Sequence, residues 1–298
     1  MRAEGSATAA PESLSRFVSL TGLAGMPVEK ARAINDREAA IMFGPVEEVF
    51  SVEEMEIGAG LRTRIYRPAA HEELPVLLYF HGGGWVVGSL DSHDGVARFL
   101  ANHSGVVVVS VDYRLAPEHR FPAAVQDAWS SFIWTREHAA LVGGETTRLA
   151  IGGDSAGGNL AAVVALHARD RGISIALQLL VYPALDSMPA DADGESSWWL
   201  RQYLRTDADG LDPDASPLRA PDVHGVAPAL ILSCGLDPLR FQAKEYARRL
   251  REAGVDTDHI CFEGLVHGAY RMPAVLPGAR DMLDASAQAL HKAFGGRT

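Results

Sequence analysis

Apolar, strand-like runs alternate with helical patterns along most of this chain of 298 residues. Several runs are apolar throughout, which is typical of strands that are covered on both faces. Strands that alternate with helices predict an α/β fold, a mainly parallel sheet with helices on both sides. The runs lie at 75–80, 106–112, 148–153, 175–183, 228–234 and 256–263, and the helical patterns lie at 94–103, 122–139, 156–170, 238–253 and 277–294.

Three segments depart from this alternation. Residues 14–42 read as helical, and Pro27 suits a first helical turn. Next, "EEVFSVEEMEI" and "LRTRIYRP" are separated by "GAG", which predicts a β-hairpin. Residues 184–227 hold one short helical pattern, around Ser197–Leu204. We expect them to form a lid above the carboxyl edge of the sheet, where the sites of open parallel sheets lie.

Charge and cysteine content exclude several classes of protein. A formal net charge of −11 argues against a nucleic-acid partner. No apolar run reaches the ~18 residues that cross a bilayer, and the start lacks the apolar core of a secretory signal. We therefore expect a cytoplasmic protein with no membrane span. Cys234 and Cys261 lie in apolar runs without metal-ligand spacing, which predicts buried thiols and neither a disulfide nor a metal site.

A nucleophile pattern lies between a predicted strand and a predicted helix. The sequence "GDSAG" at 153–157 is GxSxG, in which a sharp strand-to-helix turn lifts the hydroxyl of Ser155 clear of the backbone. Side chains two residues to either side would collide, so Gly153 and Gly157 lack them. A plain glycine-rich turn is the alternative interpretation, because GxSxG alone also occurs by chance.

Serine needs a base, and the base needs a carboxylate to hold it. His267 follows the last strand-like run in "EGLVHGAY", and Asp237 follows the preceding run in "GLDPLR". The order Ser155, Asp237, His267 is that of the α/β-hydrolase arrangement. Asp186, which also follows a predicted strand, is the competing acid, and a helix-capping role is the alternative for Asp237.

Three consecutive glycines in "HGGGW", residues 81–85, free the backbone at the end of a predicted strand. We predict that the N–H groups of Gly83, Gly84 and Ala156 form an oxyanion hole. A phosphate-binding loop is the rival, but no Lys-Ser/Thr follows and GxGxxG is absent. His81 is expected to brace the loop by hydrogen bonding.

Five motifs together resemble the hormone-sensitive-lipase-like esterases of the α/β-hydrolase superfamily. The resemblance implies an α/β-hydrolase fold with an eight-stranded, mostly parallel sheet and a helical cap. It divides the chain into an N-terminal cap segment at 1–45, a core at 46–183 and 228–298, and a cap insertion at 184–227. The motifs are "HGGGW" at 81–85, "DYRLAPEHRFPAAVQD" at 112–127, "GDSAGGN" at 153–159, "DPLR" at 237–240 and "HG" at 267–268.

The same resemblance implies hydrolysis of short- to medium-chain carboxylic esters without metal or cofactor. It assigns nucleophile, acid and base to the positions of Ser155, Asp237 and His267, while we expect the "DYRLAPE" segment to serve structure. Phe241 and Gln242 depart from the pattern, since acidic residues often follow "DPLR" in that family.

Aromatic residues are the candidates for substrate binding. An uncharged ester favours an apolar site around a few polar groups. The alternative is that these residues only pack the cap onto the sheet. The candidates are Trp85 beside the glycines and Trp198, Trp199 and Tyr203 in the predicted lid.

Other functions of the same arrangement stay open at this point. An amidase, a lactonase or a deacetylase of a small metabolite uses the same three side chains. The plant gibberellin receptor resembles this family but lacks the catalytic histidine, which is present here as His267. The last predicted strand, 256–263, is expected at a sheet edge, where a second copy could pair to form a homodimer.

Overall fold

The computed structural model describes residues 20–58, 60–70, 73–188 and 195–295. Within them, eight strands form one sheet in the order β1-β2-β4-β3-β5-β6-β7-β8. β1 and β2 pair antiparallel, as do β2 and β4, and the other neighbours are parallel. The mostly parallel sheet predicted from the sequence is confirmed. The strands are β1 Ser51–Ile57, β2 Leu61–Arg67, β3 Leu74–Phe80, β4 Val107–Val111, β5 Gly144–Asp154, β6 Gln178–Val181, β7 Ala229–Cys234 and β8 Thr257–Phe262.

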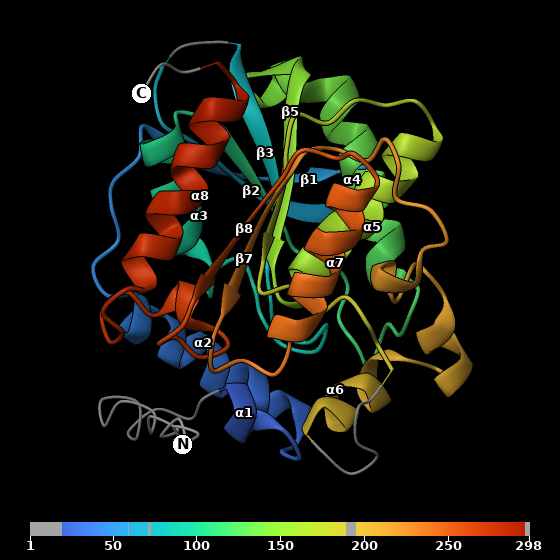
Figure 1. Ribbon diagram of the computed structural model, residues 1–298. Coiled ribbons are helices and arrows are strands. Elements are labelled where there is room, and N and C mark those ends of the chain that lie inside the picture. The colour runs from blue at the N-terminus through green and yellow to red at the C-terminus, as the bar shows by residue number, and fades with distance from the viewer. Residues whose placement is uncertain (1–19, 59, 71–72, 189–194, 296–298) are drawn as a thin grey trace, which may run out of the picture.

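Helices cover both faces of the sheet (Figure 1). Successive side chains of β3 enter different cores: Leu78 and Phe80 pack with α4, α5 and α7, whereas Leu77 and Tyr79 pack with α3 and α8. This division follows from the two-residue period of a strand and explains why the central runs are apolar throughout. The helices are α3 Asp94–Ser104, α4 Ala123–His138, α5 Ala156–Asp170, α7 Arg240–Glu252 and α8 Ala279–Ala293.

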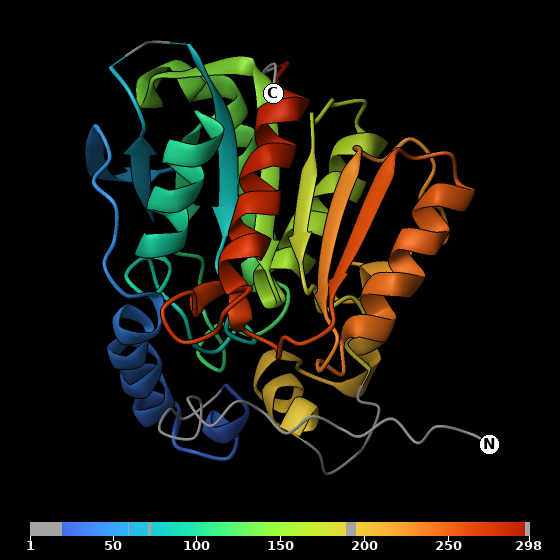
Figure 2. The same ribbon diagram turned by 60° about the vertical axis from the view of Figure 1, so that its left-hand side comes forward.

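A group of helices, which we call the cap, lies at the carboxyl ends of the parallel strands (Figures 1 and 2). It comprises α1 Leu20–Leu23, α2 Val28–Phe43 and α6 Glu195–Tyr203. The helical region expected at 14–42 is divided at Gly25, whose φ of 83° lies in the left-handed region. Its residues 14–19 lie outside the described part of the chain. None of the described helices has the length and apolar character needed to cross a bilayer.

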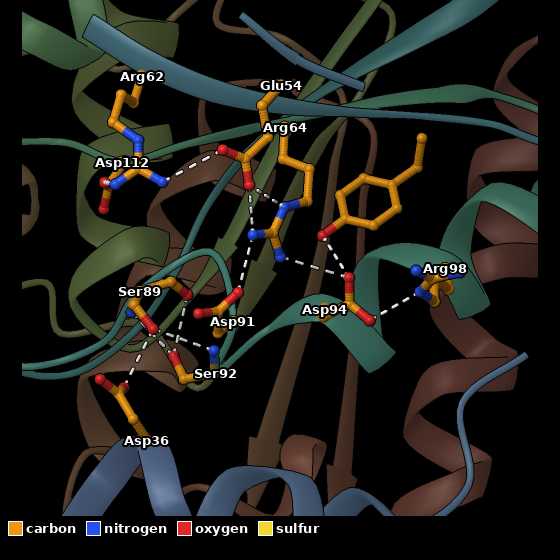
Figure 3. A network of polar contacts seen from close by, with 11 residues as sticks. Asp36, Glu54, Arg62, Arg64, Ser89, Asp91, Ser92, Asp94, Arg98 and Asp112 are labelled. Atoms are coloured by element: carbon orange, nitrogen blue, oxygen red, sulfur yellow. Dashed lines mark hydrogen bonds and ion pairs between the residues drawn. The ribbon is translucent and has the colours of Figure 1, made fainter. Parts of the chain in front are cut away.

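The β1–β2 hairpin is attached to the loop that precedes α3. Arg64 of β2 contacts Glu54 of β1 at 2.9 Å and Asp91 of the loop at 2.8 Å (Figure 3). Tyr66 adds a hydrogen bond of 2.9 Å to Asp94 at the start of α3. These contacts fix the segment that follows the glycine-rich stretch, and so help to hold the carboxyl edge of β3 in place.

Candidate active site

Ser155 occupies a strained turn between β5 and α5. Its φ of 55° and ψ of −116° are rare for a residue with a side chain. A β-carbon added to Gly153 or Gly157 would lie 2.4 or 1.9 Å from the carbonyl oxygen of Phe80. The glycines of the GxSxG pattern are therefore required by the close approach of β3, as the sequence predicts.

His267 and Asp237 complete a hydrogen-bonded line with Ser155. Nε2 of His267 lies 2.9 Å from Oγ of Ser155, and Nδ1 lies 2.6 Å from Oδ2 of Asp237. Asp237 is fully buried, and its other carboxylate oxygen accepts the N–H of Leu239 at 2.8 Å. With the carboxylate on Nδ1–H, the free lone pair of the imidazole faces the serine hydroxyl.

Asp186, the competing acid, faces another partner. Its carboxylate binds Arg219 through two contacts of 3.0 Å. Gln242 holds this segment to α7, because its Oε1 accepts the N–H groups of Leu185 and Asp186 at 2.7 and 3.0 Å. Gln242, which departs from the family pattern, thus fixes the segment that follows β6 to α7.

The glycine-rich loop presents bare backbone near Ser155. Gly83 and Gly84 have φ values of 129° and 60°, which favour glycine. In the described part of the chain, the N–H groups of Gly83, Gly84 and Ala156 donate no hydrogen bond. The N–H of Gly82, in contrast, is used inside the protein, since it donates to Asp154 at 2.9 Å.

The "DYRLAPE" segment braces this loop from behind. The hydroxyl of Tyr113 donates to the carbonyl oxygen of His81 at 2.7 Å, and the N–H of Ala116 donates to that of Trp85 at 2.8 Å. Burial lowers the pKa of His81 to about 3, so the ring is neutral near pH 7. Its Nδ1–H donates to the carbonyl oxygen of Gly82 at 2.9 Å, in keeping with the bracing role expected of His81.

The four aromatic candidates fall into two pairs. Trp85 and Tyr203 are buried and stack on each other, with ring centroids 4.1 Å apart. Trp198 and Trp199 are partly exposed and pack edge to face at 4.7 Å. Trp199 also lies against Gly84. Trp85 and Tyr203 thus join α6 to the glycine-rich loop, and their contact with substrate stays a prediction.

No group of three or more acidic, histidine or cysteine side chains in the described ranges is arranged to hold a metal ion. Cys234 is buried, Cys261 is half-buried, and both are free thiols.

Known proteins match both the sequence and the arrangement. The family described as alpha/beta hydrolase fold matches residues 77–271. Carboxylic ester hydrolase LipN of Mycobacterium tuberculosis is 45% identical over 224 residues, which are 69% of this chain and 60% of LipN. Ethyl acetate hydrolase of Pseudomonas putida is 36% identical over 90% of this chain and 91% of its own. The chain belongs to the hormone-sensitive-lipase-like esterases of the α/β-hydrolase superfamily.

A solved structure supports this assignment over nearly the full fold. An esterase of Pyrobaculum calidifontis is 39% identical, with a TM-score of 0.85, over 92% of this chain and 96% of its own. Like these relatives, the chain is a carboxylic ester hydrolase. The likeness to LipN spans less than two thirds of that protein's length.

Two polar residues of this esterase were not singled out by sequence reasoning. Asp154 precedes the serine, and His93 directly precedes α3. Both are buried, and they contact each other at 3.1 Å. The signal for Asp154 was its place inside "GDSAG". His93 is one of 11 histidines and had no distinguishing signal.

Proposed function

We propose that this esterase hydrolyses short- to medium-chain carboxylic esters through an acyl-enzyme formed on Ser155. The observation that carries the proposal is the continuous line from Ser155 through His267 to Asp237, with contacts of 2.9 and 2.6 Å. A serine hydroxyl, an imidazole and a buried carboxylate in this order suit acyl transfer.

The reaction proceeds in two steps. Oγ of Ser155 attacks the ester carbonyl carbon while Nε2 of His267 accepts the hydroxyl proton. The tetrahedral intermediate collapses, and His267 gives that proton to the leaving alcohol. Water then attacks the acyl-enzyme with His267 again as base, and the collapse of the second intermediate releases the acid and restores the serine hydroxyl.

The charge that develops on the carbonyl oxygen needs donors that are already in place. We assign these donors to the N–H groups of Gly83, Gly84 and Ala156, which have no acceptor among the described residues. Ala156 is the first residue of α5, so the positive end of the helix dipole adds to the field at the oxyanion.

A small, uncharged substrate fits the surroundings of these groups. Trp199 lies on Gly84, and Trp198 packs against Trp199, which places an aromatic wall beside the oxyanion loop. The name of the Pseudomonas putida relative, ethyl acetate hydrolase, supports a short acyl group. We propose that Trp85 and Tyr203 form the layer behind this wall.

The test is the Ser155→Ala variant on p-nitrophenyl acetate, butyrate and octanoate. We expect loss of turnover by at least ~10⁴-fold with an unchanged circular dichroism spectrum. Retained turnover would remove Ser155 from its role. A parallel panel of lactones and N-acyl amides separates ester hydrolysis from the amidase, lactonase and deacetylase alternatives, and a receptor would turn over none of the substrates.

We also propose a homodimer that pairs through β8. This strand is an edge of the sheet, and exposed edges are often covered by a partner. Ile260 of β8 is 42% exposed, and Phe241 at the start of α7 is 64% exposed. Light scattering should give the dimer mass for the natural chain and the monomer mass for Ile260→Lys; a monomer in both would overturn the proposal.

A cytoplasmic location stays a prediction. Fractionation of the source cells, followed with an antibody against the chain, would test it.

A further inference from the structure

Asp154 is a buried carboxylate that the proposed reaction does not use. Only 1% of its surface is exposed. One oxygen, Oδ1, accepts the hydroxyl of Tyr79 at 2.8 Å and the N–H of Gly82 at 2.9 Å, and lies 3.1 Å from Nε2 of His93. Burial alone would raise its pKa, but the contact with His93 and the nearby Arg271 outweigh burial and lower the pKa. The Asp154 carboxylate is therefore an anion that accepts hydrogen bonds from several donors.

This carboxylate links the turn that carries Ser155 to the glycine-rich loop. It is the residue before Ser155, and it binds the peptide N–H directly before Gly83. A β-carbon on Gly82 would lie only 2.4 Å from its Oδ2. Oδ2 also lies 3.4 Å from the hydroxyl of Tyr182, whose ring centroid is 4.7 Å from that of His267.

His93 contacts the same oxygen of the carboxylate as Tyr79 and Gly82. The ring is buried, and burial lowers its pKa, so the imidazole is neutral. Because Nε2 faces an anionic oxygen, Nε2 carries the proton and donates to Asp154. Nδ1 then accepts the hydroxyl of Ser92 at 2.9 Å. Since Nε2 is a donor, the acceptor for the N–H of Gly82 is the carboxylate of Asp154.

Further hydrogen bonds connect Ser92 to helix α2 of the cap (Figure 3). Ser89 and Ser92 exchange backbone-to-hydroxyl hydrogen bonds of 2.8 and 3.1 Å. The hydroxyl of Ser89 donates to Asp36 of α2 at 3.0 Å. A chain of hydrogen bonds thus connects α2 with the N–H of Gly82, which precedes the proposed oxyanion donors.

We propose that His93 and Asp154 are positioning residues, which fix the Gly82 peptide so that the N–H groups of Gly83 and Gly84 are aimed at the oxyanion. Three glycines in a row have little conformational preference of their own, whereas oxyanion donors act only when they are preorganised. The hydrogen bond from the N–H of Gly82 to Asp154 fixes the start of the glycine run and so preorganises the donors. This inference rests on the proposed roles of Ser155, Gly83 and Gly84.

The test compares two substitutions of the histidine. His93→Ala removes the donor to Asp154, whereas His93→Gln places an amide N–H near the position of Nε2. We expect His93→Ala to lower kcat by about 10- to 100-fold with KM changed less than about threefold, because the oxyanion forms after binding. His93→Gln should recover most of kcat.

The decisive readout is a trifluoromethyl ketone, which adds to the serine and forms a stable oxyanion. The inhibition constant of the ketone should rise in His93→Ala by the same factor as kcat falls. A covalent phosphonate, which reacts with the serine, gives the concentration of active sites used to calculate kcat. Ser104→Ala, which removes a buried hydrogen bond at the other end of α3, is the control for general destabilisation and should leave both constants unchanged.

Equal defects in His93→Ala and His93→Gln, or a loss of kcat without weaker ketone binding, would overturn the inference. If His93→Ala does not fold, the near-isosteric Asp154→Asn decides: normal kcat and ketone affinity in that variant would also overturn it. The proposed function fails separately, if Ser155→Ala remains active.

Discussion

Trp199 lies directly on Gly84, so that a β-carbon added to the glycine would come within 2.6 Å of the ring atom Cε3. The two residues are far apart in the sequence, and the packing of α6 on the glycine-rich loop brings them together. We expect Gly84→Ala to lower kcat on p-nitrophenyl acetate by about 10- to 100-fold, because the methyl group must displace either the ring or the proposed oxyanion donor.

Two further variants separate this contact from backbone strain. Gly172 has a φ of 64°, close to that of Gly84, but a β-carbon there meets nothing within 4 Å. Gly172→Ala should therefore keep wild-type kcat, and the double variant Gly84→Ala/Trp199→Ala should regain part of the loss. Equal kcat in Gly84→Ala and Gly172→Ala would show that the contact with Trp199 is unimportant.

Asp237 and Asp186 form a matched pair for identifying the catalytic acid. Asp237→Asn should lower kcat on the order of 10⁴-fold, because an amide favours the wrong tautomer of His267. Asp186→Asn alters contacts with Arg219 and with the N–H of Met188, neither of which involves His267, and should retain activity within about threefold. Steady-state kinetics of both variants at one pH decide between them, and the opposite ranking would make Asp186 the acid.

Arg32 anchors the cap helix α2 to the segments that follow the glycine-rich loop and the "DYRLAPE" strand end. It donates to the carbonyl oxygens of Val86 and Ala116 at 2.8 and 2.9 Å and pairs with Glu118 at 2.7 Å. We expect Arg32→Met to lower the free energy of unfolding by about 1–2 kcal/mol, since it leaves two carbonyl groups without a donor.

Arg37 on the same helix is the control for this prediction. Its side chain is 66% exposed and reaches Glu38 only at 3.3 Å, so Arg37→Met should change the free energy of unfolding by less than about 0.5 kcal/mol. Urea denaturation measures both variants. Indistinguishable midpoints would mean that Arg32 does not anchor the cap.

Features of the site that depend on local rules were predictable from the sequence. The glycines around Ser155 and the left-handed Gly83 and Gly84 follow from sterics, which act over a few residues. The alternation of strands and helices follows from side-chain periodicity. Asp237 was predicted as the acid from its position after a strand-like run. The choice of Asp237 over Asp186 agrees with the contacts that each carboxylate makes.

Features that depend on distant partners were not predictable. His93 meets Asp154 only because the loop before α3 folds back onto the end of β5. The stacking of Trp85 on Tyr203 likewise joins the glycine-rich loop to α6. No residue next to these positions signals such a contact, because each depends on the packing of the whole fold.

The buried histidines beside the glycine-rich loop, His81 and His93, should make stability depend on pH. The pKa of His81 is lowered by burial from its ordinary value of 6.5 to about 3, and the pKa of His93 is lowered for the same reason. Below pH 6.5 the unfolded chain therefore gains protons at these rings, whereas the folded chain does not until lower pH. The free energy of unfolding should fall as pH decreases, by up to about 1.4 kcal/mol per pH unit for His81.

The measurement is urea denaturation between pH 7.5 and 4.5, in the natural chain and in His81→Asn, whose amide N–H lies near the position of Nδ1. Asp154, whose lowered pKa removes stability only below its ordinary value of 3.8, does not contribute in this window. His93, Asp154 and Arg271 surround His81 in both proteins, so their effects cancel in the difference between the two slopes. The variant should show the shallower slope, because it has one buried ring fewer to protonate on unfolding. Identical slopes would mean that His81 is charged in the folded protein or exchanges protons equally in both states.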